Sequence, residues 1–277
     1  MAMGVPTTDN NLQPNTQTPP EVTSKPLEFI VPTEIVTLPS KGQFYPEGHP
    51  LHGRETVEIK HMTTKEEDIL TNQSFIKNGV AVDKLLQSVL VEPKMKVNDM
   101  LMCDKNALTV ACRVYGYGPD YTTQFKCPAC DETLKHEFDL NEVGHVDYET
   151  NVKEFDAAVD YDRGIIVFPI PRTKTTLELK VLKTDMTPKN RKEAKKAAFS
   201  ITKQYRKMIH SVNGSTERAH IDKYIESMSA LDSRYLRSAY PKIVPNVDFG
   251  CEFECESCGH EDTVEVPLSA EFFWPKS

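Results

Sequence analysis

The sequence lacks the long apolar runs and the leader features that would place a chain at or across a membrane. No apolar stretch approaches the roughly 20 residues that a membrane-spanning helix needs. The first residues are rich in Pro, Thr, Asn and Gln, with neither a basic start nor an apolar centre, so no secretion signal is expected. The sequence therefore predicts cytosolic synthesis, where cysteines serve as metal ligands or core residues more often than as disulfides.

Common catalytic motifs are also missing. The chain contains no phosphate-binding glycine loop, no nucleophile elbow and no zinc-protease helix motif. Its formal net charge is −8, so the molecule as a whole should not be drawn to nucleic acid or to an anionic membrane. We therefore expect a protein that is not an enzyme.

Two cysteine pairs with the same spacing stand far apart in the chain. Cys127 and Cys130 are followed by the alternating segment LKHEF, and Cys255 and Cys258 by DTVEV. A two-residue spacing before a short strand is typical of a zinc knuckle, and two knuckles form a zinc ribbon. We expect one Zn²⁺ held by four thiolates, which leaves no open position for water and indicates a structural site. Reduced thiols without metal, or a disulfide, are the alternatives.

Metal binding by distant pairs would close everything between them into an insertion. We therefore predict an α+β fold with a helical N-terminal region and an inserted β-hairpin plus helices, closed by a split four-cysteine zinc ribbon. The expected regions are residues 1–27, a flexible tail; 28–124, a loop, a short strand and helices; 125–162, the first knuckle and an acidic linker; 163–247, the inserted hairpin and helices; and 248–277, the second knuckle and an aromatic C-terminus.

Local signals predict several helices and strands. Thr64 and Glu67 have the spacing of a capping box for a helix that reaches about Lys77. Asp104 is expected to cap a later helix, and a long basic helix is expected over residues 188–209. The segment ETVEIKHM should form one strand, and GIIVFPIPRTKTTLELKVLK a pair of strands. The acidic stretch that follows the first knuckle should be irregular up to about Arg163.

Two aromatic clusters are candidate partner-binding sites. Phe44 and Tyr45 lie in the turn-rich segment LPSKGQFYPEGHPL, where they could anchor the loop on the chain's own body or on a neighbour. Phe272, Phe273 and Trp274 place large aromatics on both faces of a terminal strand. This terminal segment either closes the ribbon's own core or docks onto another subunit, and we favour docking.

The rival function is nucleic-acid binding by a zinc-ribbon regulator. The predicted basic helix carries one glutamate, Glu193, among these cations: Lys189, Arg191, Lys192, Lys195, Lys196, Lys203, Arg206 and Lys207. The segment around the second knuckle has no Lys or Arg between Ile243 and Pro275, and its acidic residues are Asp248, Glu252, Glu254, Glu256, Glu261, Asp262, Glu265 and Glu271. Such a ribbon would repel a phosphate backbone, so nucleic acid is not the expected partner.

Several motifs together resemble one protein family. LPSKGQFYPEGHPL, TTKEEDILTNQSFIKNGVAVDKLL, DKNALTVACRVYGYG, FKCPAC, DSRYLR, FECESCG and EFFWP occur in an order similar to that in the baseplate hub proteins of T-even-type contractile-tailed phages. The resemblance spans about Leu38 to Pro275, and the N-terminal tail is longer than the family implies. It implies a non-enzymatic hub or hub-assembly protein whose partners are other phage tail and baseplate hub proteins, with a second copy of the chain as a further candidate. Its expected location is the host cytoplasm during assembly and the tail baseplate of the virion. The motifs leave open whether it is a permanent component or a transient factor, and the alternative is a zinc-ribbon regulator of phage transcription or replication.

Overall fold

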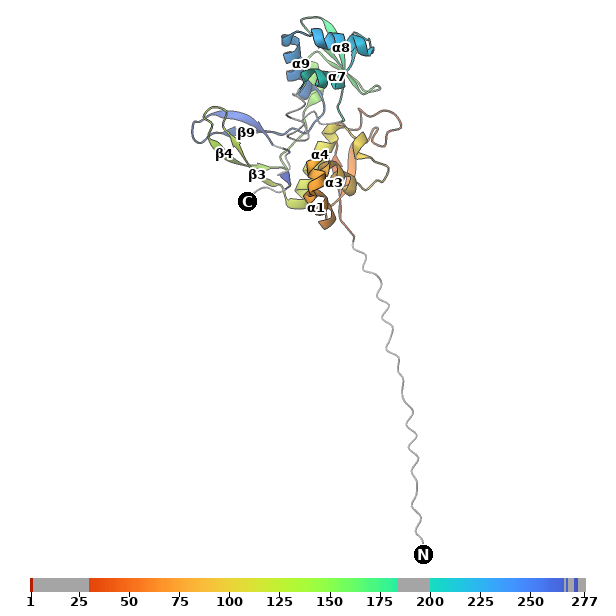
Figure 1. The fold of residues 1–277 in the computed structure, drawn as a ribbon, viewed down its shortest axis with the longest axis vertical. Helices are drawn as coiled ribbons and strands as arrows, with labels where there is room; N and C mark the ends of the chain where they lie inside the picture. Colours follow the sequence, from red (N-terminus) through yellow and green to blue (C-terminus); the bar gives the residue numbers. More distant parts are fainter. Residues whose placement is uncertain (2–29, 184–199, 267, 269–271, 274–277) are drawn as a thin grey trace. The chain divides into compact units, whose positions relative to one another are not determined.

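The larger part of the chain has an α+β fold, as predicted. The computed structural model describes residues 1, 30–183, 200–266, 268 and 272–273 (Figure 1). The chain divides into a unit of residues 1–30 and a unit of residues 31–277. The described residues of the larger unit form helices, three two-stranded antiparallel sheets and one four-stranded antiparallel sheet. Among these residues no helix is both long enough and apolar enough to cross a bilayer.

A hairpin and a group of helices make up the first region. Val57 and Ile59 alternate with exposed residues on the second strand, as the sequence predicts, and they pack into the core with Leu85 and Leu86. The elements are β1 Thr33–Thr37, β2 Thr56–Lys60, α1 Thr64–Thr71, α2 Gln73–Lys77, α3 Ala81–Val89, a 3-10 turn at Val97–Asp99, and α4 Met102–Tyr117.

The first helix begins one residue earlier than predicted. Thr63 and Glu66, not Thr64 and Glu67, form the capping box. The helix also does not continue as one element, because Asn72 adopts an extended conformation with ψ of 110°. The Asn72 side chain then caps α2, so a residue type that competes for backbone N–H groups divides the predicted helix in two.

Helix α4 starts before its predicted cap. Leu101 is the N-cap residue, and Asp104 lies inside the first turn with its side chain completely buried. That carboxylate accepts hydrogen bonds from Ser40 and Tyr45 in place of a helix N–H group. The predicted capping role of Asp104 is therefore wrong, because distant partners hold its side chain.

The insertion contains a sheet with the strand order β5-β6-β7-β8. The predicted pair of strands is confirmed as β6 and β7. Strand β5 pairs with β6 on one side, and β8 pairs with β7 on the other. The linker expected to be irregular up to Arg163 contains a helix and a strand. The elements are α5 Tyr148–Glu154, β5 Ala158–Asp160, β6 Ile165–Ile170, β7 Thr175–Lys180, α7 Ile201–Met208, β8 Ile209–Val212, α8 Arg218–Ser227 and α9 Ala230–Ile243.

The predicted basic helix is not one helix over residues 188–209. Ser200 is extended, with φ of −90° and ψ of 105°, and is the N-cap of α7. Helix α7 ends at Met208, and β8 follows at once. Residues 184–199, which include most of the predicted basic charge, lie outside the described residues. Arg206, within the described part, pairs with Asp222 at 2.8 Å and with Glu226 at 3.2 Å, so part of its charge is neutralised inside the chain.

A short neck connects the insertion to the rest of the unit. The N–H of Val146 donates to the carbonyl of Asn246 at 2.9 Å, and the N–H of Asp248 donates to Gly144 at 2.9 Å. Outside the neck lie two hairpins, one on each side of the insertion in sequence. They are β3 Asp120–Lys126 with β4 Thr133–Asp139, and β9 Gly250–Glu254 with β10 Glu261–Glu265 (Figure 1).

Candidate metal centre

The two hairpins bring the four predicted cysteines together. The sulfur atoms of Cys127, Cys130, Cys255 and Cys258 all lie within 4.8 Å of one another, although the pairs are more than a hundred residues apart. The Sγ atoms of Cys127 and Cys258 are 3.8 Å apart, and those of Cys130 and Cys255 are also 3.8 Å apart. Zn–S bonds of about 2.3 Å at tetrahedral angles place sulfur atoms about 3.8 Å apart. The arrangement therefore fits a tetrahedral ion with four thiolate ligands.

Each knuckle is the same backbone turn. In the first, Cys127 N–H donates to the carbonyl of Glu132 at 2.8 Å, and Asp131 N–H donates to Cys127 at 3.0 Å. In the second, Cys255 N–H donates to the carbonyl of His260 at 2.9 Å, and Gly259 N–H donates to Cys255 at 2.8 Å. The residue after the second cysteine has positive φ in both turns, 60° at Asp131 and 66° at Gly259, as the knuckle pattern predicts.

The thiols of this group differ electrostatically. Burial would raise the pKa of the Cys127 thiol, but hydrogen bonds from the backbone N–H groups of Cys130 and Ala129, and from the Cys130 and Cys255 side chains, outweigh burial, and the pKa falls to about 7. At Cys130 and Cys258 a backbone N–H group lowers the pKa, but desolvation and the neighbouring thiols outweigh it, so the pKa of Cys130 rises to about 12 and that of Cys258 also rises. A thiolate is the form that binds metal. Cys127 and Cys255 are fully buried, whereas Cys130 and Cys258 are exposed, so the site is open to solvent on one side.

A small apolar cluster of the two hairpins packs next to the cysteine centre. Phe125 of the first hairpin packs edge-on against Phe253 of the second, with ring centroids 4.8 Å apart. Cys251 is half-buried in the same region, with its Sγ 3.4 Å from Nε2 of His136. Neither His136 nor His260 joins the four-cysteine group in the described residues, so the thiolate set is complete without histidine.

Two further cysteines belong to the core. Cys103 and Cys112 on α4 are buried, at 3% and 2% exposure. Burial raises the pKa of Cys112 to about 12, so this thiol stays protonated. These two side chains behave as small apolar residues rather than as ligands.

Arg113 ties the first hairpin to the residues that follow the second. Its guanidinium is buried and donates to the carbonyl oxygens of Phe272 at 3.0 Å, of Asp120 at 2.7 Å, and of Gly118. Gly118 ends α4 and Asp120 begins β3, so a single side chain joins three segments. No short sequence pattern predicted this role for Arg113. Its signal was a charged residue within the otherwise largely apolar segment ALTVACRVYGY.

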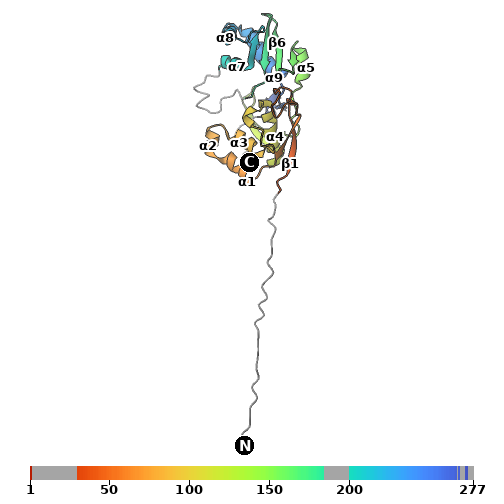
Figure 2. The ribbon, with the colours of Figure 1, turned by 90° about the vertical axis from the view of Figure 1, so that its right-hand side faces the viewer.

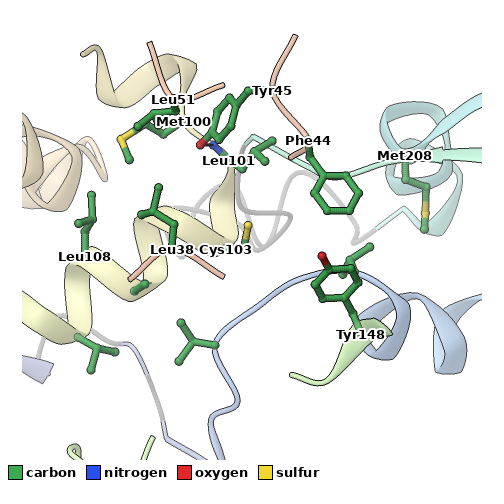
Figure 3. Close-up of a cluster of buried hydrophobic side chains, with 14 of the residues drawn as sticks. Leu38, Phe44, Tyr45, Leu51, Met100, Leu101, Cys103, Leu108, Tyr148 and Met208 are labelled. Atoms are coloured by element: carbon green, nitrogen blue, oxygen red, sulfur yellow. Dashed lines mark hydrogen bonds between the residues drawn. The ribbon is translucent and has the colours of Figure 1, made fainter. Parts of the chain in front are cut away.

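The loop aromatics lie inside the chain's own core. Phe44 is 6% exposed and Tyr45 2% exposed. The Phe44 ring packs edge-on against Tyr148 and Tyr161, with centroids 5.8 and 6.0 Å away, and Figure 3 shows Phe44 and Tyr148 facing each other. These rings anchor the loop on the body of the protein, so they do not offer the exposed aromatic surface proposed for partner binding.

Tyr45 belongs to a buried polar network that the sequence analysis also missed. Its hydroxyl donates to Oδ2 of Asp104 at 2.7 Å and accepts from the backbone N–H of Leu101 at 2.9 Å, beside which it lies in Figure 3. The Ser40 hydroxyl donates to the same Oδ2 at 2.7 Å. Burial raises the pKa of Asp104, while the hydrogen bonds from Ser40 and Tyr45 oppose that rise. The network fixes the loop on the N-terminal turn of α4.

The C-terminal aromatics are also internal where the structure describes them. Phe272 is 1% exposed and Phe273 3% exposed, and Phe272 packs edge-on against Tyr121 at 5.2 Å. Phe272 lies in a 3-10 turn, not in the predicted strand. The expectation that opposite faces of a strand carry these rings is wrong here. Their burial favours closure of the chain's own core, and Trp274 lies outside the described residues.

Comparison with known proteins gives one match. The chain matches the family model described as T4 bacteriophage base plate protein over residues 31–274. No curated protein and no solved structure matches at a significant level. The matched span includes both hairpins, the insertion between them and the helices of the first region. The chain belongs to the T4 bacteriophage base plate protein family.

Proposed function

We propose that this baseplate protein is a non-enzymatic hub or hub-assembly component that acts through contacts with other phage tail proteins. The observation that carries the proposal is the family match over nearly all of the larger unit. Its partners would be other baseplate hub proteins, met in the host cytoplasm during assembly and, if the protein is a permanent component, retained in the virion tail. The polar groups singled out above serve the fold. Asp104 and Arg113 are buried and spend their hydrogen bonds on the chain itself.

The cysteine centre would hold one structural Zn²⁺. The ligands would be Cys127, Cys130, Cys255 and Cys258, whose sulfur spacing suits a tetrahedral ion. The bound ion would neutralise thiolate charge and fix the two hairpins against each other, and no position would remain open for a reacting water. Through this link the base of the insertion would be held closed.

Assembly is tested in infected cells. A tagged chain is expressed during infection by the phage that encodes it, and the proteins that accompany it are identified at physiological and at high salt. We expect tail and baseplate proteins to co-purify with it. Salt-sensitive retention on DNA without any tail protein would instead support the regulator, and would contradict the proposal.

The same infected cells distinguish a permanent role from a transient one. If the protein is a hub component, it should be present in purified virions in constant ratio to other baseplate proteins. If it acts only in assembly, it should accompany baseplate intermediates and be absent from virions. A protein found in neither fraction would contradict both forms of the proposal.

A further inference from the structure

Among the described residues, no strand pairs with the outer edge of β1. At its two ends, Leu38 N–H donates to Glu55 at 2.8 Å, and His61 N–H donates to Pro32 at 2.9 Å. On the β1 side these bonds involve Pro32 and Leu38, which both have even numbers. In an antiparallel ladder, residues whose backbone N–H and C=O groups point to the neighbouring strand alternate with residues whose groups point away. The backbone N–H and C=O groups that point away from β2 are therefore those of Thr33, Ile35 and Thr37.

The opposite edge of the same sheet is occupied. The carbonyl of Glu58 on β2 accepts from Val91 N–H at 3.3 Å, and Ile59 forms a bridge with Leu90. Within the part of the chain that the structure describes, β1 has β2 as its single neighbour in the sheet. In Figure 2, β1 runs along the outer margin of the helical region. The sheet can therefore grow only at β1.

The side chains of β1 suit another strand. Ile35 is 69% exposed at the centre of the outer face, between the exposed Thr33 and Thr37. The single charged residue of the strand, Glu34, points to the other face, where its carboxylate lies 3.0 Å from Nε2 of His61. Proteins usually protect exposed edges with lysine, proline or a bulge, and β1 has none of these.

We propose that β1 pairs with β1 of a second copy of this chain, antiparallel and centred on Ile35. In that register Ile35 lies opposite Ile35 of the copy and Thr33 lies opposite Thr37, so the outward backbone groups of each strand meet their complements. Glu34 then faces Val36 rather than a second glutamate, so no like charges are opposed. The outer face of β1, formed by Thr33, Ile35 and Thr37, is uncharged and β-branched, so it suits a copy of itself as its neighbour.

A five-residue strand buries little surface, so the pairing is a weak contact that a high local concentration would favour. Disulfide trapping can detect such a contact. Residues that exchange backbone hydrogen bonds across an antiparallel pair have Cα atoms about 5.5 Å apart, within the range a disulfide accepts. Ile35→Cys should form a covalent dimer under mild oxidation of the full-length chain. Zinc is present throughout, and the wild-type chain serves as the blank for its own cysteines.

The register has matched controls. Thr33→Cys mixed with Thr37→Cys should give a mixed dimer, whereas neither variant alone should dimerise. Lys60→Cys is exposed on the same face of β2, but lies away from the pairing edge, so it should give no dimer above the blank. Adding Ile35→Lys to the Thr33 and Thr37 variants should reduce the mixed dimer severalfold.

Three outcomes would overturn the proposal. The first is an Ile35→Cys dimer no more abundant than the Lys60→Cys dimer. The second is dimerisation of Thr33→Cys alone to the level of the mixture. The third is an Ile35→Cys thiol that resists a small alkylating reagent in dilute monomer, since that would mean another segment of the same chain covers the edge.

Discussion

The two knuckle hairpins have the same turn conformation but differ in the residues around the turn. Both turns place a buried cysteine first and an exposed cysteine second, and both form the same pair of backbone hydrogen bonds. The first hairpin uses Asp131 where the second uses Gly259. The residue pairs next to the turns are Lys126 with Thr133 in the first and Glu254 with Glu261 in the second. The two turns therefore share their backbone conformation and their cysteines, while the neighbouring side chains differ.

The hairpins also differ in how they are joined to the rest of the chain. Arg113 donates to Asp120, the first residue of β3. At the second hairpin the corresponding bonds lie outside the strands, where Asp248 N–H donates to Gly144 and Arg113 donates to Phe272. The second hairpin depends more on the shared cysteine centre and on the Phe125–Phe253 contact for its position. Changes at the centre should therefore loosen the second hairpin more than the first.

The largest effect is expected from loss of a ligand. Cys255→Ser leaves three thiolates, so metal content measured by elemental analysis should fall from about one zinc ion per chain to near zero. Amide hydrogen exchange should accelerate across β9 and β10 more than across β3 and β4, because only the first hairpin receives a bond from Arg113 within its own strands. Equal acceleration of both hairpins would contradict the comparison.

Cys103→Ser is the matched control for that variant. Cys103 is a buried core thiol away from the knuckles, so its replacement should leave the zinc content unchanged, whatever it does to stability. If gently purified wild-type protein contains no zinc at all, the assignment of the four cysteines as ligands is wrong.

The next largest effect should follow Arg113→Met. This change removes the donor to three carbonyl groups at once, and each buried carbonyl left unpaired costs about 1 kcal/mol or more. We expect the free energy of unfolding in urea to fall by about 2–4 kcal/mol, with zinc still bound. Arg234→Met on the exposed side of α9 is the control, and it should change stability by less than about 0.5 kcal/mol. Equal losses in the two variants would show that the Arg113 link adds nothing.

Much of this architecture was predictable because local spacing encodes it. The cysteine pairs, the positive φ after each and the β6–β7 hairpin all follow from short patterns. The roles of Asp104 and Phe44 do not, because their partners lie far away in sequence; Ser40 is 64 residues from Asp104. Helical periodicity could not reveal that Ser200 is extended, since its neighbours favour a helix. Local rules thus predicted the four-cysteine cluster and failed where long-range packing decides.

A smaller effect separates the two turn residues. Gly259 has φ of 66° with nothing within 4 Å of the position a Cβ would occupy, so Gly259→Ala introduces backbone strain without a steric clash. That strain is about 1–2 kcal/mol for an L-residue in the left-handed region, and the affinity for zinc in chelator competition should fall accordingly. Asp131→Gly should instead leave the affinity unchanged or raise it, because Asp131 already bears the cost of positive φ. A loss of similar size in both variants would mean that the knuckles are not equivalent turns.

The smallest effect concerns charge beside the second knuckle. Glu254 and Glu261 lie directly opposite each other across β9 and β10, and like charges in that position are destabilising. Glu261→Lys converts the repulsion into attraction, and should raise the free energy of unfolding of the zinc-bound protein by about 0.5 kcal/mol at low salt. Glu265→Lys makes the same change in net charge opposite Gly250, which has no side chain, so it isolates the cross-strand pair from the general effect of charge. The difference between the two variants should shrink as salt is raised, because exposed charges are screened. If the two variants are equally stable at low salt, repulsion between Glu254 and Glu261 does not lower the free energy of unfolding.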